Sequence, residues 1–181
     1  MLSVNGERLL ERINELGAIG KDEEGRRTRL AASDTEKQGR DKVVSWMKDA
    51  GLKVVVDRIG NIFGIWETEE NKEKKPLMVG SHIDTVINAG QYDGCLGVIG
   101  GIEVIKTLKD AGYQSERPIV VGAFTNEEGV RYSPDMMGSL VYADGLPVDE
   151  VLKTVGTDGT ILGEELKRIG YEGTVEPGFL Q

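Results

Sequence analysis

The sequence predicts a layered α/β domain with a mostly parallel or mixed sheet, flanked by helices and with a hairpin at one side. Short apolar stretches rich in β-branched residues alternate along the chain with stretches of helical periodicity. The chain has 181 residues, enough for one domain with a core of its own. It shows no internal repeat, low-complexity tract or long linker, so we expect one structural unit.

Two helices are predicted first. Apolar residues share one helical face near the start of the chain: Leu9, Leu10, Ile13 and Leu16. A second helix is predicted from residues 33–36 (SDTE), which have the form of a capping box, and Gly51 stands where a C-terminal cap belongs. Its apolar stripe consists of Val43, Val44, Met47 and Ala50.

Strands and a third helix follow. Two β-rich segments within residues 52–66 surround Gly60 and Asn61, which predicts a hairpin, and the charged stretch 67–75 predicts a solvated turn. Residues 76–82 (PLMVGSH) and 118–124 (PIVVGAF) each predict a buried strand. Between these strands a helix is predicted over 97–112, closed by Gly112 and with three inward residues, Val98, Ile102 and Ile105. After a loop at 145–147, a weaker helical pattern covers 164–169.

Charge and cysteine content narrow the classes of function. The chain has 22 basic and 31 acidic residues and a net charge of −9, which disfavours binding to nucleic acid or to an anionic membrane. No apolar run is long enough to span a bilayer or to serve as a signal peptide, so we expect a cytoplasmic protein that acts on a small molecule. Cys95 is the only cysteine, so any metal must be held by oxygen and imidazole.

Two polar clusters follow the predicted strands, at 80–85 (GSHIDT) and 126–129 (NEEG). Ligands of α/β sheets bind beyond the carboxyl ends of the strands. A divalent metal that activates water needs anionic or imidazole ligands and a nearby base. Residues of these types lie in the clusters and in the loop between them: His82, Asp84, Asp93, Glu127 and Glu128.

Each candidate also has a plainer interpretation. His82, the only histidine, would alone be an ordinary hydrogen-bonded residue. The carboxylate of Asp84 could accept the second imidazole N–H or form an Asx turn, and spacing does not decide between them. Asp93 in GQYDG could be a simple N-cap. Glu127 and Glu128 repel each other unless a cation lies nearby, although adjacent glutamates are also frequent on surfaces.

Two rival sites are weaker. The glycines of DGCLGVIGG (93–101) could cradle a phosphate at a helix start, but their spacing differs from G-x-G-x-x-G and no P-loop lysine is present. Cys95 as a nucleophile lacks a free histidine partner, and its neighbours have the small size typical of helix packing.

Three long motifs resemble one known family: GSHIDTV (80–86), GQYDGCLGVIGGIEVIKTL (90–108) and FTNEEGVRYSPDMMGSL (124–140), and residues 27–64 fit the same pattern. The family is that of the metal-dependent amidohydrolases that include N-carbamoyl-L-amino-acid hydrolases and allantoate amidohydrolases, relatives of zinc aminoacylases and dipeptidases. The resemblance implies a three-layer, zinc-exopeptidase-like catalytic domain. It further implies that residues 1–181 are its incomplete N-terminal part, without the family's inserted dimerisation domain and C-terminal part, and that the full-length family forms homodimers.

The resemblance also implies residue roles. Two divalent ions, zinc or manganese, cobalt or nickel, would be held by His82, by a bridging Asp93 and by Glu128. Glu127 would be the base for a metal-bridging water, Asp84 would orient His82, and the substrate would be a small ureido or amide compound. The family's two further histidine ligands have no counterpart here, which leaves two ligands for each ion. Because catalytic zinc usually has three, we expect the isolated chain to bind metal weakly and to be catalytically silent.

Two alternatives remain at this stage. A peptidase or aminoacylase relative would use the same metals on peptide or acyl-amide bonds. A truncated, non-catalytic binding module would expose part of its apolar sheet and self-associate. Asp144 departs from the family's pattern, which more often has glycine there, and we interpret it as loop variation.

Overall fold

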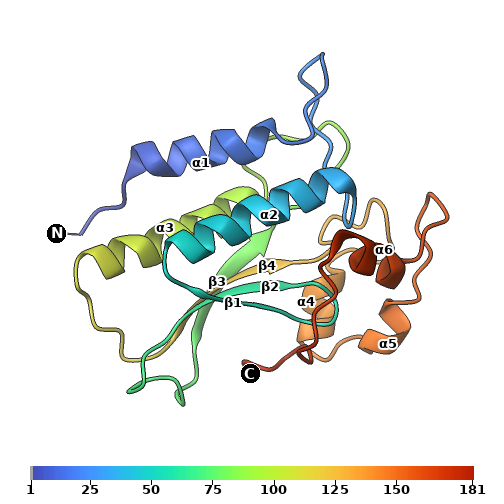
Figure 1. Ribbon diagram of the computed structural model, residues 1–181. Helices are drawn as coiled ribbons and strands as arrows, with labels where there is room; N and C mark the ends of the chain where they lie inside the picture. The colour runs from blue at the N-terminus through green and yellow to red at the C-terminus, as the bar shows by residue number, and fades with distance from the viewer. Residues whose placement is uncertain (1) are drawn as a thin grey trace.

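A four-stranded sheet with the order β1-β2-β4-β3 organises the chain, and the computed structural model describes its residues 2–181 (Figure 1). The strands are β1 (Lys53–Val56), β2 (Ile62–Trp66), β3 (Leu77–His82) and β4 (Ile119–Phe124). Strands β1 and β2 form the predicted hairpin, β2 is also antiparallel to β4, and only β3 and β4 are parallel. The α/β class is therefore confirmed. The sheet is mixed, because β4 has the antiparallel strand β2 on one side and the parallel strand β3 on the other.

Three long helices lie on one side of the sheet, two of them packed on it and the first in the chain packed on the third, and three short ones gather at the end where β4 finishes (Figure 1). The long helices are α1 (Gly6–Ala18), α2 (Asp34–Asp49) and α3 (Cys95–Asp110). The short helices are α4 (Met137–Tyr142), α5 (Val148–Val151) and α6 (Leu162–Ile169). The predicted helices α1, α2, α3 and α6 are confirmed. Helices α4 and α5 were not predicted, because six and four residues are too few to show a helical period.

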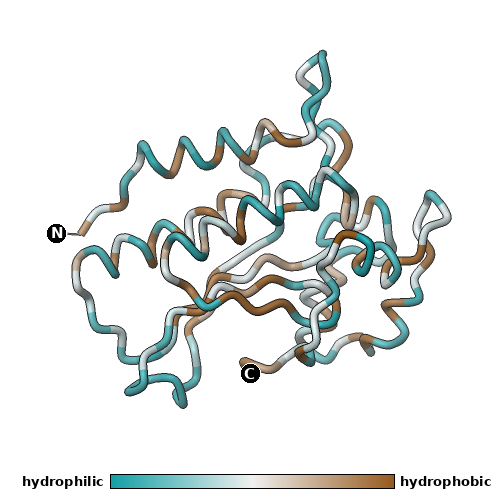
Figure 2. The backbone as a smooth tube through the Cα atoms, viewed as in Figure 1, coloured by the Kyte–Doolittle hydropathy of each residue, from teal (hydrophilic) through white to brown (hydrophobic). Residues whose placement is uncertain are grey.

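The strand residues alternate between two apolar clusters. Ile62, Val121 and Ala123 belong to the core beneath the long helices. Phe63 and Val120 point to the opposite face. There Phe63 packs against three aromatic rings, those of Phe124, Tyr142 and Phe179. Figure 2 shows hydrophobic residues concentrated along the strands, whereas α1 alternates between hydrophobic and hydrophilic along its length.

Two local expectations for α1 and α2 need correction. In α1, Leu10 is 53% exposed and Arg12 is buried instead, because the guanidinium of Arg12 lies 5.6 Å from the ring of Trp46 in α2. In α2, the hydroxyl of Ser33 accepts from the N–H of Glu36 as a capping box requires. The Glu36 carboxylate, however, accepts from the N–H of Ala32 and pairs with the buried guanidinium of Arg40, so the box is not reciprocal.

Part of the apolar surface stays uncovered among residues 2–181. Strand β3 is at an edge of the sheet, and its Leu77 and Val79 are exposed. Leu96 and Val104, two turns apart on one side of α3, are exposed as well. This agrees with the expectation of an uncovered apolar region, whereas self-association stays a prediction. No helix within 2–181 is both long and apolar enough to cross a membrane.

Candidate metal centre

The parallel pairing of β3 with β4 brings the two polar clusters together. His82 is the last residue of β3 and lies opposite Phe124, the last residue of β4. The loop that follows β4 therefore begins beside the imidazole. Nε2 of His82 lies 3.3 Å from Oε2 of Glu127, and ligand atoms of His82, Glu127 and Glu128 all lie within 4.8 Å of one another. Three of the five predicted site residues thus form one group.

Asp84 connects the histidine to the glutamate pair. Nδ1 of His82 donates to the main-chain carbonyl of Asp84 at 3.0 Å, and the Asp84 carboxylate is 3.6 Å from the same nitrogen. That carboxylate accepts the N–H groups of Glu127 at 3.2 Å and Glu128 at 3.1 Å. Asp84 therefore lies beside His82, but its carbonyl is the acceptor in place of the predicted carboxylate, because the carboxylate binds the N–H groups of the next loop. Since Nδ1 donates, Nε2 of a neutral ring is the nitrogen left for a ligand.

Asp93 lies at the rim of this group. Its side chain is 77% exposed, and its Oδ1 is 4.0 Å from Nε2 of His82. It is not among the three residues whose ligand atoms lie within 4.8 Å of one another. The bridging role that the resemblance implies for Asp93 therefore stays a prediction.

The charges in the group show that it suits a cation. Burial lowers the pKa of His82, but the hydrogen bonds and charge of Asp84, followed by the charge of Glu127, outweigh it and raise the pKa to about 9. Burial, and then the charges of Asp93, Asp84 and Glu127, raises the pKa of Glu128, although His82 opposes this. A protonated imidazole thus balances converging carboxylates. Nitrogen and oxygen donors that converge in this way match the ligands of zinc and related divalent ions.

Comparison with known proteins decides the family. The family model described as peptidase family M28 matches residues 61–177, which is more than half of the chain. The chain belongs to peptidase family M28. The predicted resemblance to the carbamoylase group is confirmed by close relatives of this M28 chain.

Two relatives and one solved structure illustrate that likeness. An N-carbamoyl-L-amino acid amidohydrolase of Geobacillus stearothermophilus is 44% identical over 144 residues, 80% of this chain and 35% of the relative. A probable allantoate deiminase of Oryza sativa subsp. japonica is 43% identical over 138 residues, 75% of this chain and 28% of the relative. The crystal structure of a hydantoinase/carbamoylase family amidase from Burkholderia multivorans has TM-score 0.94 and 42% identity, with 98% of this chain and 43% of that chain covered. The M28 chain spans about a third of the length of the curated relatives that it matches.

Sequence reasoning missed a residue that supports the glutamate pair. Asn126, just before Glu127, is buried with φ of 52°, a left-handed conformation that asparagine tolerates better than most residues. Its Nδ2 donates to the carbonyls of Tyr132 at 2.8 Å and Pro134 at 3.1 Å, so it fixes the loop that carries both glutamates. An asparagine directly before the acidic pair was the available signal.

Sequence reasoning also missed Arg29, which supports the main chain next to His82. It is fully buried, its Nε donates to the carbonyl of Ile83 at 2.7 Å, and its Nη1 donates to the carbonyl of Leu16 at 3.1 Å. Its Nη2 lies 3.2 Å from Sγ of Cys95. Cys95 is buried, and burial raises the pKa of its thiol, so the M28 chain uses this cysteine for packing at the start of α3.

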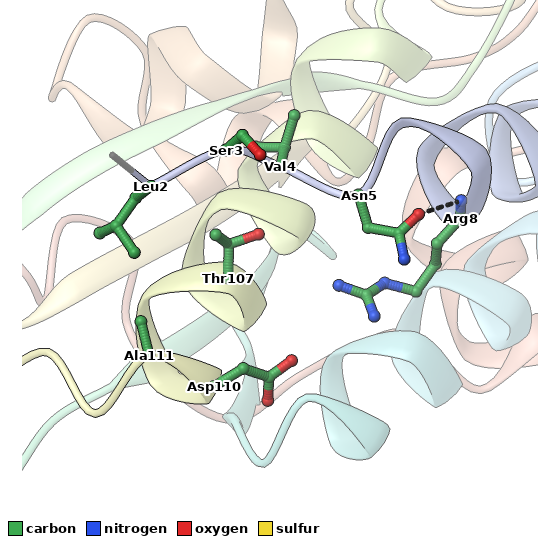
Figure 3. Close-up of a pocket in the computed structure, with 8 residues that line it drawn as sticks. All are labelled: Leu2, Ser3, Val4, Asn5, Arg8, Thr107, Asp110 and Ala111. Carbon is green, nitrogen blue, oxygen red and sulfur yellow. Dashed lines mark hydrogen bonds between the residues drawn. The ribbon is translucent and has the colours of Figure 1, made fainter.

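A separate hollow of about 570 Å³ lies between the N-terminal segment and the end of α3 (Figure 3). Its lining residues are Leu2, Ser3, Val4, Asn5, Arg8, Thr107, Asp110 and Ala111. Asn5 caps α1 by accepting the N–H of Arg8 at 3.0 Å, and Nε and Nη2 of Arg8 each lie 2.7 Å from a carboxylate oxygen of Glu103. Because these polar groups already satisfy one another, the hollow offers no comparable site in the M28 chain.

Proposed function

We propose that this M28 chain supplies metal ligands and the general base of an amidohydrolase that cleaves a linear, non-peptide C–N bond. The substrate class is a small ureido compound of the N-carbamoyl-L-amino acid or allantoate type. One observation carries the proposal: His82, Glu127 and Glu128 converge at the carboxyl ends of the parallel strands β3 and β4. The likeness to the Geobacillus amidohydrolase, at 44% identity, supports the substrate class.

His82 would hold one divalent ion and Glu128 a second, and Asp93 at the rim would be a ligand to both. When bound, such an ion polarises a carbonyl group and makes a water molecule more acidic. Zinc, manganese, cobalt and nickel all suit imidazole and carboxylate donors, and the proposal is not specific among them. Asp84 fixes the ring of His82 through its carbonyl and the main chain of both glutamates through its carboxylate.

Glu127 is the proposed general base. Its side chain is 36% exposed, so it can reach solvent, and its carboxylate faces Nε2 of His82. In the overall reaction the oxygen of water adds to the substrate carbonyl carbon and the C–N bond breaks. Glu127 accepts a proton from the water and delivers it to the leaving nitrogen.

Three ligand residues, with Asp93 counted for both ions, give two ligands for each ion, fewer than the three that catalytic zinc usually has. We therefore also propose that the isolated chain has no measurable hydrolytic activity. Activity would require further ligands that residues 1–181 do not supply, and the relatives named above are longer than this chain. The second candidate, a peptidase or aminoacylase, is favoured by one observation, that the matching family model is described as a peptidase family.

A chimera tests this proposal. The aligned region of the Geobacillus amidohydrolase, 35% of that protein, is replaced by this chain. We expect hydrolysis of N-carbamoyl-L-amino acids or allantoate, with little on dipeptides or N-acetyl amino acids. Glu127→Gln should lower kcat by about 10³-fold, because it removes the base, whereas Glu11→Gln on the exposed side of α1 should not.

Two results would contradict the proposal. A chimera that prefers dipeptides would establish the peptidase candidate instead. A folded, zinc-loaded chimera whose activity is unchanged by Glu127→Gln would exclude Glu127 as the base.

A further inference from the structure

Gly94 occupies a tight turn between Asp93 and α3. Its φ is 65° and its ψ is −51°, and the N–H of Cys95 donates to the carbonyl of Asp93 at 2.6 Å. These are the features of a γ-turn with positive φ, which is rare and strained for residues that have a side chain. The turn leaves Asp93 exposed at the rim of the candidate metal centre, with its carboxylate toward His82.

The same glycine is in close contact with His82. A Cβ atom at position 94 would lie 2.6 Å from Cε1, Nε2 and the carbonyl oxygen of His82. The ring has little freedom to move away, since it is only 4% exposed and its Nδ1 is held by the carbonyl of Asp84. A side chain at 94 would therefore press on the ring at the nitrogen that faces Glu127.

We propose that Gly94 is a positioning residue that keeps the space beside Nε2 of His82 open and holds the Asp93 turn next to it. The metal half of this inference rests on the proposed function. The steric half does not, because it concerns the packing of Gly94 against His82 without any ion. The packing of Gly94 against His82 and the metal affinity are therefore measured separately.

The variant Gly94→Ala tests the inference, with Gly112→Ala as the matched control. Gly112 also has a positive φ, 69°, but a Cβ there would meet nothing within 4 Å. Both substitutions therefore strain the backbone, and only the first crowds His82. His82 is the only histidine, so its Cε1–H NMR signal in the untagged 181-residue chain reports on one ring without ambiguity.

Without metal, we expect Gly94→Ala to shift the His82 ring signal and Gly112→Ala to leave it in place. On titration with zinc alone, Gly94→Ala should weaken the affinity read from that signal by about tenfold or more, as removal of other supports of metal ligands does. Equal ring signals and equal zinc affinities in the two variants would overturn the inference. If the wild-type chain binds no zinc, the proposed metal site fails, and the metal-free signal still decides the steric half.

A double-mutant cycle covers the case in which Gly94→Ala unfolds the chain. His82→Ala removes the two ring contacts of the new methyl group and leaves its contact with the carbonyl oxygen at position 82. We expect the fall in urea midpoint caused by Gly94→Ala to be smaller in the His82→Ala background than in the wild type. An equal fall in both backgrounds would show that the imidazole ring plays no part in the effect of the substitution and would overturn the inference.

Discussion

At His82 the two ring nitrogens face different surroundings, and this difference defines the site. Nδ1 is held by the main chain of Asp84, whereas Nε2 faces the carboxylate of Glu127. The sequence predicts that the two polar clusters lie at one edge of the sheet, because each cluster follows an apolar strand. It could not show that the Asp84 carboxylate binds the N–H groups of the next loop, since that contact joins residues 43 and 44 positions apart.

The raised pKa of His82 predicts how stability depends on pH in the metal-free chain. The ordinary pKa is 6.5 and the folded value is about 9, so the folded state holds the proton more tightly than the unfolded state. The resulting stabilisation is complete below pH 6.5 and is lost as pH rises through 9. It amounts to about 3 kcal/mol in the free energy of unfolding.

Urea unfolding at pH 6 and at pH 9.5 measures this effect. The wild-type chain should lose most of that stabilisation at the higher pH, and His82→Gln, which carries no titrating ring, should lose much less. If both proteins change by the same amount, the charges of Asp84 and Glu127 do not act on the imidazole as described.

At the scale of elements, the conformation of Asp144 after α4 accounts for the glycine that the family more often has at this position. Asp144 follows α4 with φ of 58°, and its N–H donates to the carbonyl of Val141 at 3.2 Å. A left-handed residue after a helix favours glycine, because glycine has no Cβ to clash there. The earlier interpretation as loop variation therefore has a conformational basis.

Asp144→Gly should accordingly raise the free energy of unfolding by about 0.5 kcal/mol, because the relief of strain exceeds the added flexibility of the unfolded chain. The matched control is Glu11→Gly within α1, which should lower it by about 1 kcal/mol. Thermal or urea unfolding of the wild type and the two variants measures both changes in the free energy of unfolding. A loss of stability in Asp144→Gly would show that the aspartate makes a contact worth more than its strain.

Most elements could be predicted because their patterns are local. The short apolar runs of β2 and β4 and the apolar stripe of α3 are visible in the sequence itself. The sheet order could not be predicted, since it depends on long-range pairs such as Ile62 with Ala123. The position of Asp93 also escaped prediction, because the γ-turn at Gly94 sets it rather than any periodic pattern.

At the scale of the whole molecule, the chain combines a cluster of candidate metal ligands with apolar residues that stay exposed on β3 and α3. Glu127 and Glu128 converge on the buried His82, while the edge strand β3 and one side of α3 keep apolar residues exposed. This combination fits the proposal that residues 1–181 carry only part of a catalytic domain of family M28. His82, Glu127 and Glu128 all lie within this chain, so metal binding by this group can be tested on the chain alone.

The most direct measurement is zinc bound per chain after equilibrium dialysis against rising zinc concentrations. Three proteins are compared, the wild type, His82→Ala and Glu128→Gln, with Glu11→Gln as a control for the loss of a surface carboxylate. We predict weak, saturable binding in the wild type and the control, and a loss of that binding in both site variants, because each variant removes a ligand. Zinc binding that is the same in His82→Ala as in the wild type would contradict the account, since His82 would then not be part of a metal site.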